Sequence, residues 1–350
     1  MIDVGLIGFG LGGRCFHAPV VRAVPGLQLA AILQRTGDSA ARAFPDTRVV
    51  RSLDELLAID SIRLIAISTP NPTHFSLAKS CLEAGRDVIV DKPFTTTLAE
   101  AVELLKLAKK LGRVLSVYHN RRFDADFQSL CHSVAAGDLG RILRFESTYD
   151  RFRPIRKPGA WREQPGPGSG VLFDLAPHLI DQAMTLLGKP LAITADVRIE
   201  RPGFTTDDAF DILLHFPEGS RALLRATMMS AVPRPRLVVL GEKGCYLKRE
   251  FDPLEPNLRN GQIPIGLSWV VEKEENYGEL TIVENGDATT RKIPSTGDWR
   301  EFYANVRDAI LGKAPLLVTP QQILDVMIAL DLAQESNSKR ATIPWRHVEA

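Results

Sequence analysis

The sequence predicts an α/β protein of two domains, and two features of the chain carry this prediction. Up to residue 121, short apolar runs alternate with helical patterns, which is typical of a doubly wound parallel sheet whose strands are buried on both faces. From residue 122 to residue 350, strand-like runs follow one another and the helical patterns are grouped apart from them. This second pattern indicates an α+β domain with a large, mostly antiparallel open sheet. We therefore place the domains at 1–121 and 122–350.

The expected elements follow these two patterns along the chain. In the first domain we expect strands at 4–7, 27–33, 64–68, 88–90 and 114–118, and helices at 16–24, 53–59, 75–84 and 98–111. In the second domain we expect strands at 142–149, 191–198, 210–216, 221–228 and 237–240, and helices at 123–136, 175–187 and 321–333.

Composition excludes several classes of function. The chain is 45% hydrophobic and 24% charged, and its net charge of +1 offers no basic surface for nucleic acid or an anionic membrane. The four cysteines show no CxxC spacing and the seven histidines are scattered, so we predict no metal site. No apolar run reaches the length of a membrane span, and the glycine-rich N-terminus lacks the basic start of a signal peptide. We expect a cytoplasmic protein.

A glycine motif joins the first expected strand to the first expected helix. Gly8-Phe9-Gly10-Leu11-Gly12-Gly13 fits the G-x-G-x-x-G pattern of a Rossmann domain. Such glycines let the backbone approach a pyrophosphate, while the helix N-terminus supplies N–H groups and the positive end of its dipole. A glycine turn without a ligand is the alternative, and the strand–loop–helix context argues against it. We predict that Gly8, Phe9, Gly10 and Gly13 bind a dinucleotide.

The end of the second expected strand discriminates between the two nicotinamide cofactors. A carboxylate there binds the ribose 2′-hydroxyl of NAD and repels the 2′-phosphate of NADP. This chain has Gln34-Arg35-Thr36 instead, and its next carboxylate is Asp38. Arginine clamps phosphate well, so the charge at Arg35 favours NADP(H), with NAD(H) as the second choice. A solvated loop arginine is the alternative.

Two polar loops follow further strands at the same edge of the expected sheet. Thr69, Pro70, Asn71 and His74 form a rigid polar loop that suits the nicotinamide end of a cofactor, although the loop also caps the next helix. In the second loop, Asp91-Lys92-Pro93 ends a buried strand. Proline ends the ladder there and fixes the direction of Lys92, whose ammonium can bond a substrate oxygen. A surface Asp–Lys pair explains the second loop equally well on spacing alone.

A further pair stands at the predicted start of a helix. Asp174 and His178 are four residues apart, and Pro177 lacks an N–H, so we expect Pro177 in the first turn and Asp174 near the N-cap. A carboxylate beside a histidine is the usual way to poise a base for a hydroxyl proton. A helix cap with an ordinary buried histidine is the structural alternative. Metal binding is the weakest of the three interpretations, because only two candidate ligands are present.

These motifs together resemble the glucose–fructose oxidoreductase / inositol dehydrogenase / rhizopine catabolism family over essentially the whole chain. The family motifs are GFGLGG at 8–13, STPNPTH at 68–74, DKP at 91–93 and D-x-x-x-H at 174–178. Other segments are similar to its NADP-dependent scyllo-inositol dehydrogenase-like subgroup: SVYHNRRFDADF at 116–127, DRFRP at 150–154, WRE at 161–163, GPGSGVLFDLAPHLIDQ at 166–182 and GEKGCYLKREFDPLEPNLRNG at 241–261.

The resemblance implies a fold, an assembly and a catalytic set. The fold is a Rossmann domain followed by a domain with an open antiparallel sheet, through which we expect a homodimer or homotetramer. The peptide before Pro93 is expected to be cis, aiming Lys92 at the nicotinamide. Lys92, Asp174 and His178 are the implied catalytic residues. The family more often has glutamate where Asp91 stands.

The resemblance also implies a reaction: oxidation of a ring hydroxyl of a polyol or sugar, or reduction of the matching ketone, with scyllo-inositol as the best single substrate. His178 would take the hydroxyl proton, Asp174 would orient it and Lys92 would hold the oxygen, and the roles of His178 and Lys92 can be exchanged. Further cofactor contacts are expected from Asp91, Lys92, His119, Trp161 and Arg162, and substrate contacts from Asn120, Arg121, Tyr149 and Arg153.

Two other functions fit the same motifs. The family also contains NAD-dependent glycosidases, which oxidise and re-reduce the sugar during hydrolysis. A non-catalytic sensor of dinucleotide or sugar would use the same fold. Loss of Lys92 or His178 would favour the sensor, and both are present.

Overall fold

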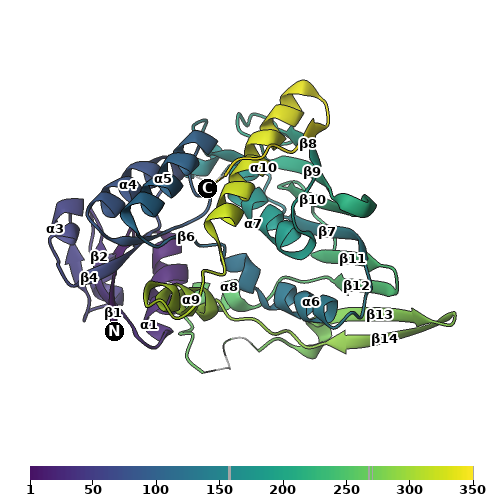
Figure 1. The fold of residues 1–350 in the computed structure, drawn as a ribbon, viewed down its shortest axis with the longest axis horizontal. Helices are drawn as coiled ribbons and strands as arrows, with labels where there is room; N and C mark the ends of the chain where they lie inside the picture. The colour runs from purple at the N-terminus through teal and green to yellow at the C-terminus, as the bar shows by residue number, and fades with distance from the viewer. Residues whose placement is uncertain (157–158, 267–268, 270, 350) are drawn as a thin grey trace.

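The computed structural model describes residues 1–156, 159–266, 269 and 271–349. Two sheets lie beside each other with helices packed against them (Figure 1). The first sheet is parallel, in the order β3-β2-β1-β4-β5-β6. Its strands are β1 (Ile2–Ile7), β2 (Leu27–Leu33), β3 (Arg48–Val50), β4 (Ile62–Ile67), β5 (Asp87–Val90) and β6 (Leu115–Val117). This order confirms the predicted doubly wound fold.

The strand order decides which loops meet. Because β1 lies between β2 and β4, the sequence reverses direction across the sheet at this point, and ligands of open α/β folds bind there, beyond the carboxyl ends of the strands. The loops after β1, β4 and β5 leave neighbouring strands at this edge. The predicted segments 8–13, 68–74 and 91–93 are therefore brought together.

Helix α5 (Leu98–Leu111) shows how closely local signals can set an element. The Thr97 hydroxyl accepts a hydrogen bond from the Glu100 N–H, and the Glu100 carboxylate accepts one from the Thr97 N–H, which forms a capping box. Gly112 ends the helix in the left-handed conformation with φ +62°. The other helices against this sheet are α1 (Ala18–Ala23), α2 (Ser39–Ala43), α3 (Leu53–Leu57) and α4 (His74–Glu83).

The helix after the glycine motif begins earlier than the predicted 16–24. A π-helical turn, η1 (Gly12–His17), leads directly into α1. Glycine is a poor helix former, so the helix propensity of the sequence did not indicate this earlier start. The helix N-terminus consequently lies inside the glycine motif itself, where its free N–H groups face the carboxyl edge of the sheet.

The second sheet has the order β14-β13-β12-β11-β7-β10-β9-β8-β15. In the described part of the chain β7 and β10 are parallel and the other neighbours are antiparallel, which confirms the mostly antiparallel prediction. The strands are β7 (Ile142–Asp150), β8 (Ala192–Arg198), β9 (Ala209–His215), β10 (Arg221–Thr227), β11 (Leu237–Gly241), β12 (Gly244–Lys248), β13 (Gly278–Glu284), β14 (Asp287–Ile293) and β15 (Ile343–Pro344).

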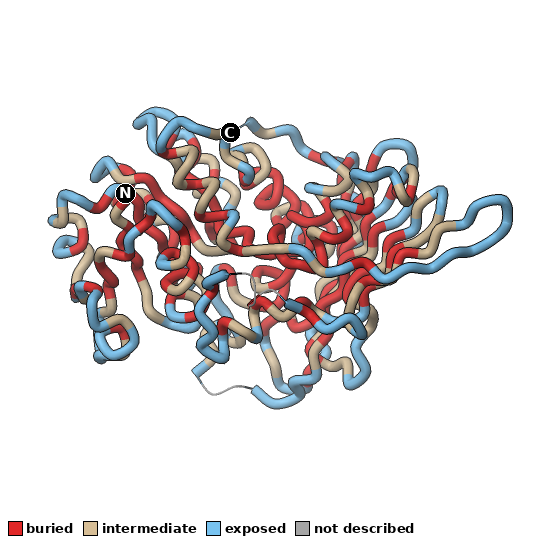
Figure 2. The backbone as a smooth tube through the Cα atoms, turned by 90° about the horizontal axis from the view of Figure 1, so that it is seen from below, coloured by how far each residue is buried: buried red, intermediate tan, exposed pale blue. Residues whose placement is uncertain are grey.

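Several of these strands have too weak an apolar signal to be predicted. Strand β14 is exposed along most of its length. The hairpin that it forms with β13 projects from the molecule, and its tip is exposed (Figure 2). On the open face of the second sheet, Leu213, Leu223 and Val238 are half-buried. Self-assembly through this sheet stays a prediction. None of the helices in the described ranges is long and apolar enough to cross a bilayer.

Helices cover the other face of the second sheet and reach the first. They are α6 (Ala125–Ala135), α7 (Gly170–Leu187), α8 (Leu254–Arg259), α9 (Arg300–Ile310) and α10 (Pro320–Lys339). Helix α7 packs on β7, β9 and β10, while α10 packs on β8, α7, α5 and β6. Helix α9, which the pattern did not predict, packs on α1. The C-terminal helices thus hold α7 beside the first sheet (Figure 1).

Helix α7 corrects the predicted start at residue 175. It begins at Gly170, so Pro177 lies inside the helix and Asp174 is one turn in from the start instead of near the N-cap. The start is capped from a distant segment, because the Asp207 carboxylate accepts from the Leu172 N–H at 2.6 Å. Pro177, inside the helix, removes one backbone hydrogen bond. The start of α7 could not be predicted from the local pattern, because the residue that caps it is distant in the sequence.

Candidate active site

The glycine motif leaves space above the backbone and closes it below. Gly8 has φ +96°, and a Cβ there would lie 2.3 Å from the Ser68 carbonyl oxygen. A Cβ on Gly13 would lie 2.1 Å from the carbonyl oxygen of Gly8, whereas one on Gly10 would have nothing within 4 Å. Close packing beneath an open loop at a helix N-terminus fits a bound pyrophosphate.

The loop after β4 ties this site to the second domain. Asn71 is buried, and its Nδ2 donates to the Gly168 carbonyl at 2.7 Å, just before α7. Both ring nitrogens of His74 lie 2.9 Å from backbone carbonyl oxygens, those of Pro93 and Thr69. These contacts position the loop. Direct cofactor contacts by Thr69, Asn71 and His74 stay predictions, as does that of Pro70.

Arg35 is exposed beyond β2, and its guanidinium has no hydrogen-bond or ion-pair partner within the described ranges. The nearby carboxylate is already occupied, because Arg51 Nη2 lies 2.7 Å from Asp38 Oδ1 and Arg51 Nη1 donates to the carbonyls of Gln34 and Gly37. Phe9 packs edge-on against Phe44 at 5.8 Å. The local charge at this end of the site is therefore positive.

Asp91 faces the glycine motif. Its Oδ1 accepts from the Lys92 N–H at 2.8 Å and its Oδ2 accepts from Ser68 Oγ at 3.2 Å, while His17 Nε2 lies 3.6 Å from Oδ2. Burial alone would raise the pKa of Asp91, but the nearby His17 and the charge of Lys92 hold the pKa well below its usual range. The peptide bond between Lys92 and Pro93 is cis, as the resemblance implies.

The Lys92 ammonium crosses to α7 of the second domain. Its Nζ donates to the Asp174 backbone carbonyl and lies 3.2 Å from Asp174 Oδ1. Arg162 Nε lies 3.1 Å from the same oxygen, and its guanidinium stacks over Trp161 at 4.4 Å. Burial lowers the pKa of Lys92 although Asp174 opposes the shift. Burial would raise the pKa of Asp174, but Lys92 and Arg162 hold it below its usual range.

The histidines of the site are buried and incompletely bonded. Nδ1 of His178 and Nδ1 of His119 have no hydrogen-bond partner in the described structure. Burial and the positive charges of Lys92 and Arg121 lower the pKa of His178 well below 6.5. Burial likewise lowers the pKa of His119. Both side chains are therefore neutral near pH 7, and each has one buried ring nitrogen without a partner.

The geometry corrects the predicted pairing within α7. Asp174 was expected to orient His178, but among the described contacts its carboxylate bonds Lys92 and Arg162 and has no bond to His178. The physical reason is charge: two cations attract the carboxylate more strongly than a neutral imidazole does. Lys92 nevertheless contacts Asp174, and His178 follows one turn later in the same helix, so the three residues lie in one region of the site.

A group of arginines surrounds Tyr149 on the second sheet. The guanidinium carbons of Arg121, Arg151 and Arg236 lie 5.4, 5.2 and 5.3 Å from the centre of its ring. Arg121 also pairs with Asp124 at 3.2 Å and with Glu255. The predicted substrate contact of Arg121 therefore competes with a structural network. Asn120 is buried beside Arg121, and Arg153 is exposed two residues beyond Arg151.

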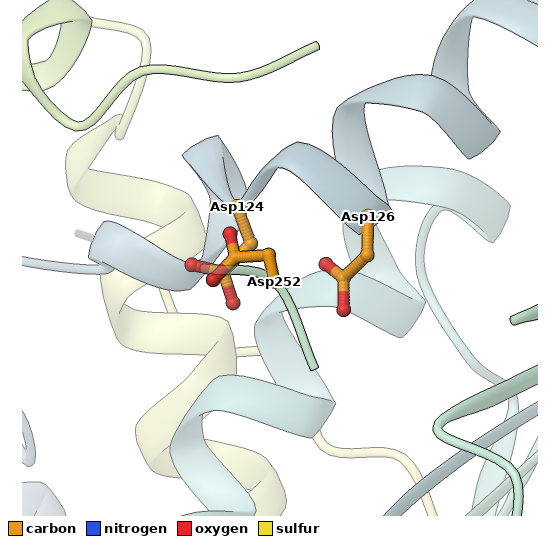
Figure 3. Close-up of side chains that lie close together, drawn as sticks. All are labelled: Asp124, Asp126 and Asp252. Atoms are coloured by element: carbon orange, nitrogen blue, oxygen red, sulfur yellow. The ribbon is translucent and has the colours of Figure 1, made fainter. Parts of the chain in front are cut away.

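Three buried carboxyl groups lie beneath this arginine group. Asp124, Asp126 and Asp252 each place one oxygen within 4.8 Å of the others (Figure 3). Asp124 accepts from Trp299 Nε1 at 2.8 Å, and Asp126 lies 3.5 Å from Arg236 Nε. Burial raises the pKa of Asp124 to about 6 and that of Asp252 well above its usual value. The nearby arginines balance part of the charge of these carboxyl groups.

Three further residues of the site were not predicted. Ser68 and His17 lie against Asp91, and the charge of Arg151 lowers the pKa of Asp174. Arg151 had a signal in the sequence, since it continues the side-chain alternation two residues beyond Tyr149, where the expected strand ends. For His17 there was no such signal, because a helical histidine looks alike whether it faces a core or a carboxylate.

Family models match both domains of the chain. Residues 2–119 match the model described as an oxidoreductase family with an NAD-binding Rossmann fold. Residues 127–247 match the Gfo/Idh/MocA C-terminal domain. The chain is 44% identical over 343 residues to the uncharacterized oxidoreductase YdgJ of Escherichia coli K12, covering 98% of each chain.

Other relatives extend the match to solved structures. The chain is 34% identical to IolW of Bacillus subtilis, named scyllo-inositol 2-dehydrogenase (NADP(+)), covering 99% of this chain and 96% of that one. The structure of yvaA from Bacillus subtilis superposes with a TM-score of 0.94 at 34% identity, and YPO2259 from Yersinia pestis with 0.93 at 38%, each covering 99% of this chain and 98% of the other. The chain belongs to the Gfo/Idh/MocA oxidoreductase family.

Proposed function

We propose that this Gfo/Idh/MocA oxidoreductase transfers a hydride between NADP(H) and a ring hydroxyl or ketone of a polyol or sugar. One observation carries the proposal: the Lys92 ammonium, bonded to Asp174, lies beside the buried and incompletely bonded His178 at the edge where the glycine motif opens. A hydrogen-bond donor and a free base next to a dinucleotide loop are what the oxidation of an alcohol requires.

The residues present fit a nicotinamide dinucleotide. The space above Gly10 and the helix N-terminus suit the pyrophosphate. The exposed Arg35 suits a 2′-phosphate, and this is favoured because the nearby Asp38 is neutralised by Arg51. The loop at Thr69 would lie along the nicotinamide end. When bound, this cofactor accepts or donates the hydride, and the side chains of the protein do the rest.

The side chains divide the work between charge and proton transfer. Lys92 donates a hydrogen bond to the reacting oxygen and stabilises the negative charge that develops on it. Asp174 holds the ammonium in place and keeps it charged despite its burial. His178 is neutral because burial lowers its pKa, so it is ready to take the hydroxyl proton. In the reverse direction the same groups return the proton to the ketone oxygen.

The first substrate pair to test is scyllo-inositol and its ketone. The support is a relative: IolW, at 34% identity over nearly the full length, carries that activity and NADP in its name. The test measures absorbance at the reduced-nicotinamide band with purified protein, NADP⁺ or NAD⁺, and a panel of scyllo-inositol, myo-inositol and aldoses. Reduction of NADP⁺ by an inositol is the expected result. The absence of any absorbance change, both with this panel and with D-glucuronate and myo-inositol 1-phosphate, would contradict the proposal.

The role of His178 has its own test. His178→Asn should lower kcat at least about a hundredfold while NADPH affinity is retained, because general base catalysis contributes about that much. In the parent protein the acid limb of the rate profile should lie below pH 6.5, since the pKa of His178 is lowered from that value. His132→Asn, on the exposed side of α6, is the matched control. An unchanged profile in His178→Asn would assign the proton to Lys92.

A further inference from the structure

We propose that this site prefers a polyol that carries an anionic group, a carboxylate or a phosphate, to its neutral counterpart, and that Arg151 and Arg153 bind this group. The proposal deepens the function proposed above and rests on it. It stands on the direction in which these two side chains extend, on the absence of partners for them in the described structure, and on the balance of charge around Lys92.

The backbone after β7 aims both arginines at the site. The Arg151 N–H donates to the Thr227 carbonyl at 2.9 Å and the Arg153 N–H donates to the Met228 carbonyl at 2.8 Å, so the strand-like path continues past the end of β7. Side chains alternate along such a path. Arg151 and Arg153 therefore share the face of the buried Tyr149, and Phe152 between them points the other way, where it is exposed.

The charge around the catalytic groups is unbalanced. Lys92 and Arg162 share the single carboxylate of Asp174. The guanidinium groups of Arg151 and Arg153 have no hydrogen-bond or ion-pair partner among residues 1–156, 159–266, 269 and 271–349. The positive charges that act on Asp174, those of Lys92, Arg162 and Arg151, therefore outnumber its single carboxylate, while Asp91 acts on Lys92 and Glu163 acts on Arg153.

Three other arginines of the same domain, in contrast to these two, are paired with carboxylates. Arg121 pairs with Asp124 and Glu255, Arg201 with Asp208 at 2.9 Å, and Arg234 with Asp150 at 2.7 Å. Unpaired arginine guanidiniums that face a site bind anions well, because the planar group donates two parallel bonds to a carboxylate or a phosphate.

The position of this pair favours the substrate over the phosphates of the cofactor. The glycine motif and Arg35 belong to the first sheet, whereas Arg151 and Arg153 extend from β7 of the second sheet. The guanidinium of Arg151 lies against Tyr149, and its charge acts on Asp174. Arg153 lies two residues further along the same face: partial burial and the charge of Arg151 lower its pKa, while Asp174 and Glu163 oppose the shift. A bound anion would relieve the repulsion between the two cations.

The experiment compares neutral and anionic members of two probe pairs: D-glucose with D-glucuronate, and myo-inositol with myo-inositol 1-phosphate. Binding to the NADPH-loaded protein and kcat/KM with NADP⁺ are measured at fixed ionic strength. The anionic member of at least one pair should be preferred by about tenfold or more. A preference within the first pair indicates a carboxylate, and one within the second indicates a phosphate. Added salt should weaken binding of the anionic member only.

The double variant Arg151→Gln/Arg153→Gln should remove the preference and leave the Kd of NADPH within about twofold. Arg144→Gln, on the open face of the sheet, is the matched control and should change neither quantity. Equal use of neutral and anionic probes, or binding of none of them, would overturn the inference. So would an equal loss of NADPH affinity in the double variant, because the arginines would then serve the cofactor.

The result also separates this inference from the proposed function. Arginine-dependent binding of an anionic probe without any absorbance change, with either NADP⁺ or NAD⁺, would keep the anion site and reject the oxidoreductase proposal. Turnover of the neutral probes with no preference for the anionic ones would do the opposite.

Discussion

The nucleotide end of the site and its chemical end are built in different ways. The nucleotide end consists of backbone from short loops that leave adjacent parallel strands, and its central feature is a run of glycines at a helix N-terminus. The chemical end consists of charged side chains, such as Lys92, Asp174, Arg162 and Arg151, that come from loops and a helix of both domains. A backbone site is fixed by local sequence, whereas a side-chain site depends on which distant charges the fold brings together.

The largest effect is expected where the two ends meet. Lys92→Met should lower kcat by about a thousandfold, because one oriented donor to a developing oxyanion contributes roughly that much. The Kd of NADPH should change little, since backbone holds the cofactor. Absorbance and fluorescence titration measure the two quantities, with Lys79→Met, a surface residue paired with Glu103, as control. If the affinity for NADPH fell together with kcat, the two ends of the site would not be separable.

The ends of helices α7 and α5 offer the same contrast between distant and local interactions, and here it is measured as the free energy of unfolding. Gly170→Ala in α7 should lower the free energy of unfolding by about 3 kcal/mol, because the residue has φ +86° and a Cβ would lie 2.0 Å from the Asp207 carboxylate. Gly112→Ala in α5 should cost only about 1 kcal/mol, since a Cβ there meets nothing within 4 Å. Chemical denaturation measures both. Equal costs would show that the distant cap of α7 is unimportant.

Cofactor choice tests whether the nucleotide end uses any side-chain charge. Arg35→Asp should weaken NADPH binding by about thirtyfold and leave NADH binding similar or better, because a charged hydrogen bond to the 2′-phosphate is replaced by repulsion. Arg113→Asp, exposed beyond α5, serves as the control. Unchanged NADPH affinity in Arg35→Asp would remove Arg35 from the site and leave the glycine backbone alone.

The smallest effect concerns carboxyl groups whose pKa values are shifted in opposite directions in the two regions. The pKa of Asp91 is lowered, whereas burial raises that of Asp124 to about 6. A raised pKa in the folded state means that folding binds a proton, so the buried carboxyl group lowers stability as pH rises from about 4 to about 6. Asp126 adds to this shift through its charge.

Asp126→Asn should therefore gain stability relative to the parent protein as pH rises over that interval, by about 1 kcal/mol. Urea denaturation at several pH values gives the difference. Asp60→Asn, exposed in a loop, should show a difference that does not change with pH. A flat difference for Asp126→Asn would mean that the arginines already neutralise these carboxyl groups.

The comparison between α5 and α7 shows where prediction from the sequence succeeds. The bounds of α5 were predicted correctly because Thr97, Glu100 and Gly112 lie within one turn of its ends. The start of α7 was placed five residues late because Asp207, which caps it, is far away in the sequence. The start of the first helix was also missed, because the low helix propensity of the glycines at 12–13 argued against a helix that the packing at the sheet edge allows.

The sequence by itself determined the order of elements, the two sheets, the glycine motif and the set of reactive side chains. These follow from periodicity and turn chemistry, which act between residues close together in the chain. Only the tertiary structure decided that Asp174 binds Lys92 instead of His178, that Asp91 faces His17, and that Arg151 and Arg153 have no partner in the described structure. Electrostatic pairing depends on distance in space and on burial, and folding sets both.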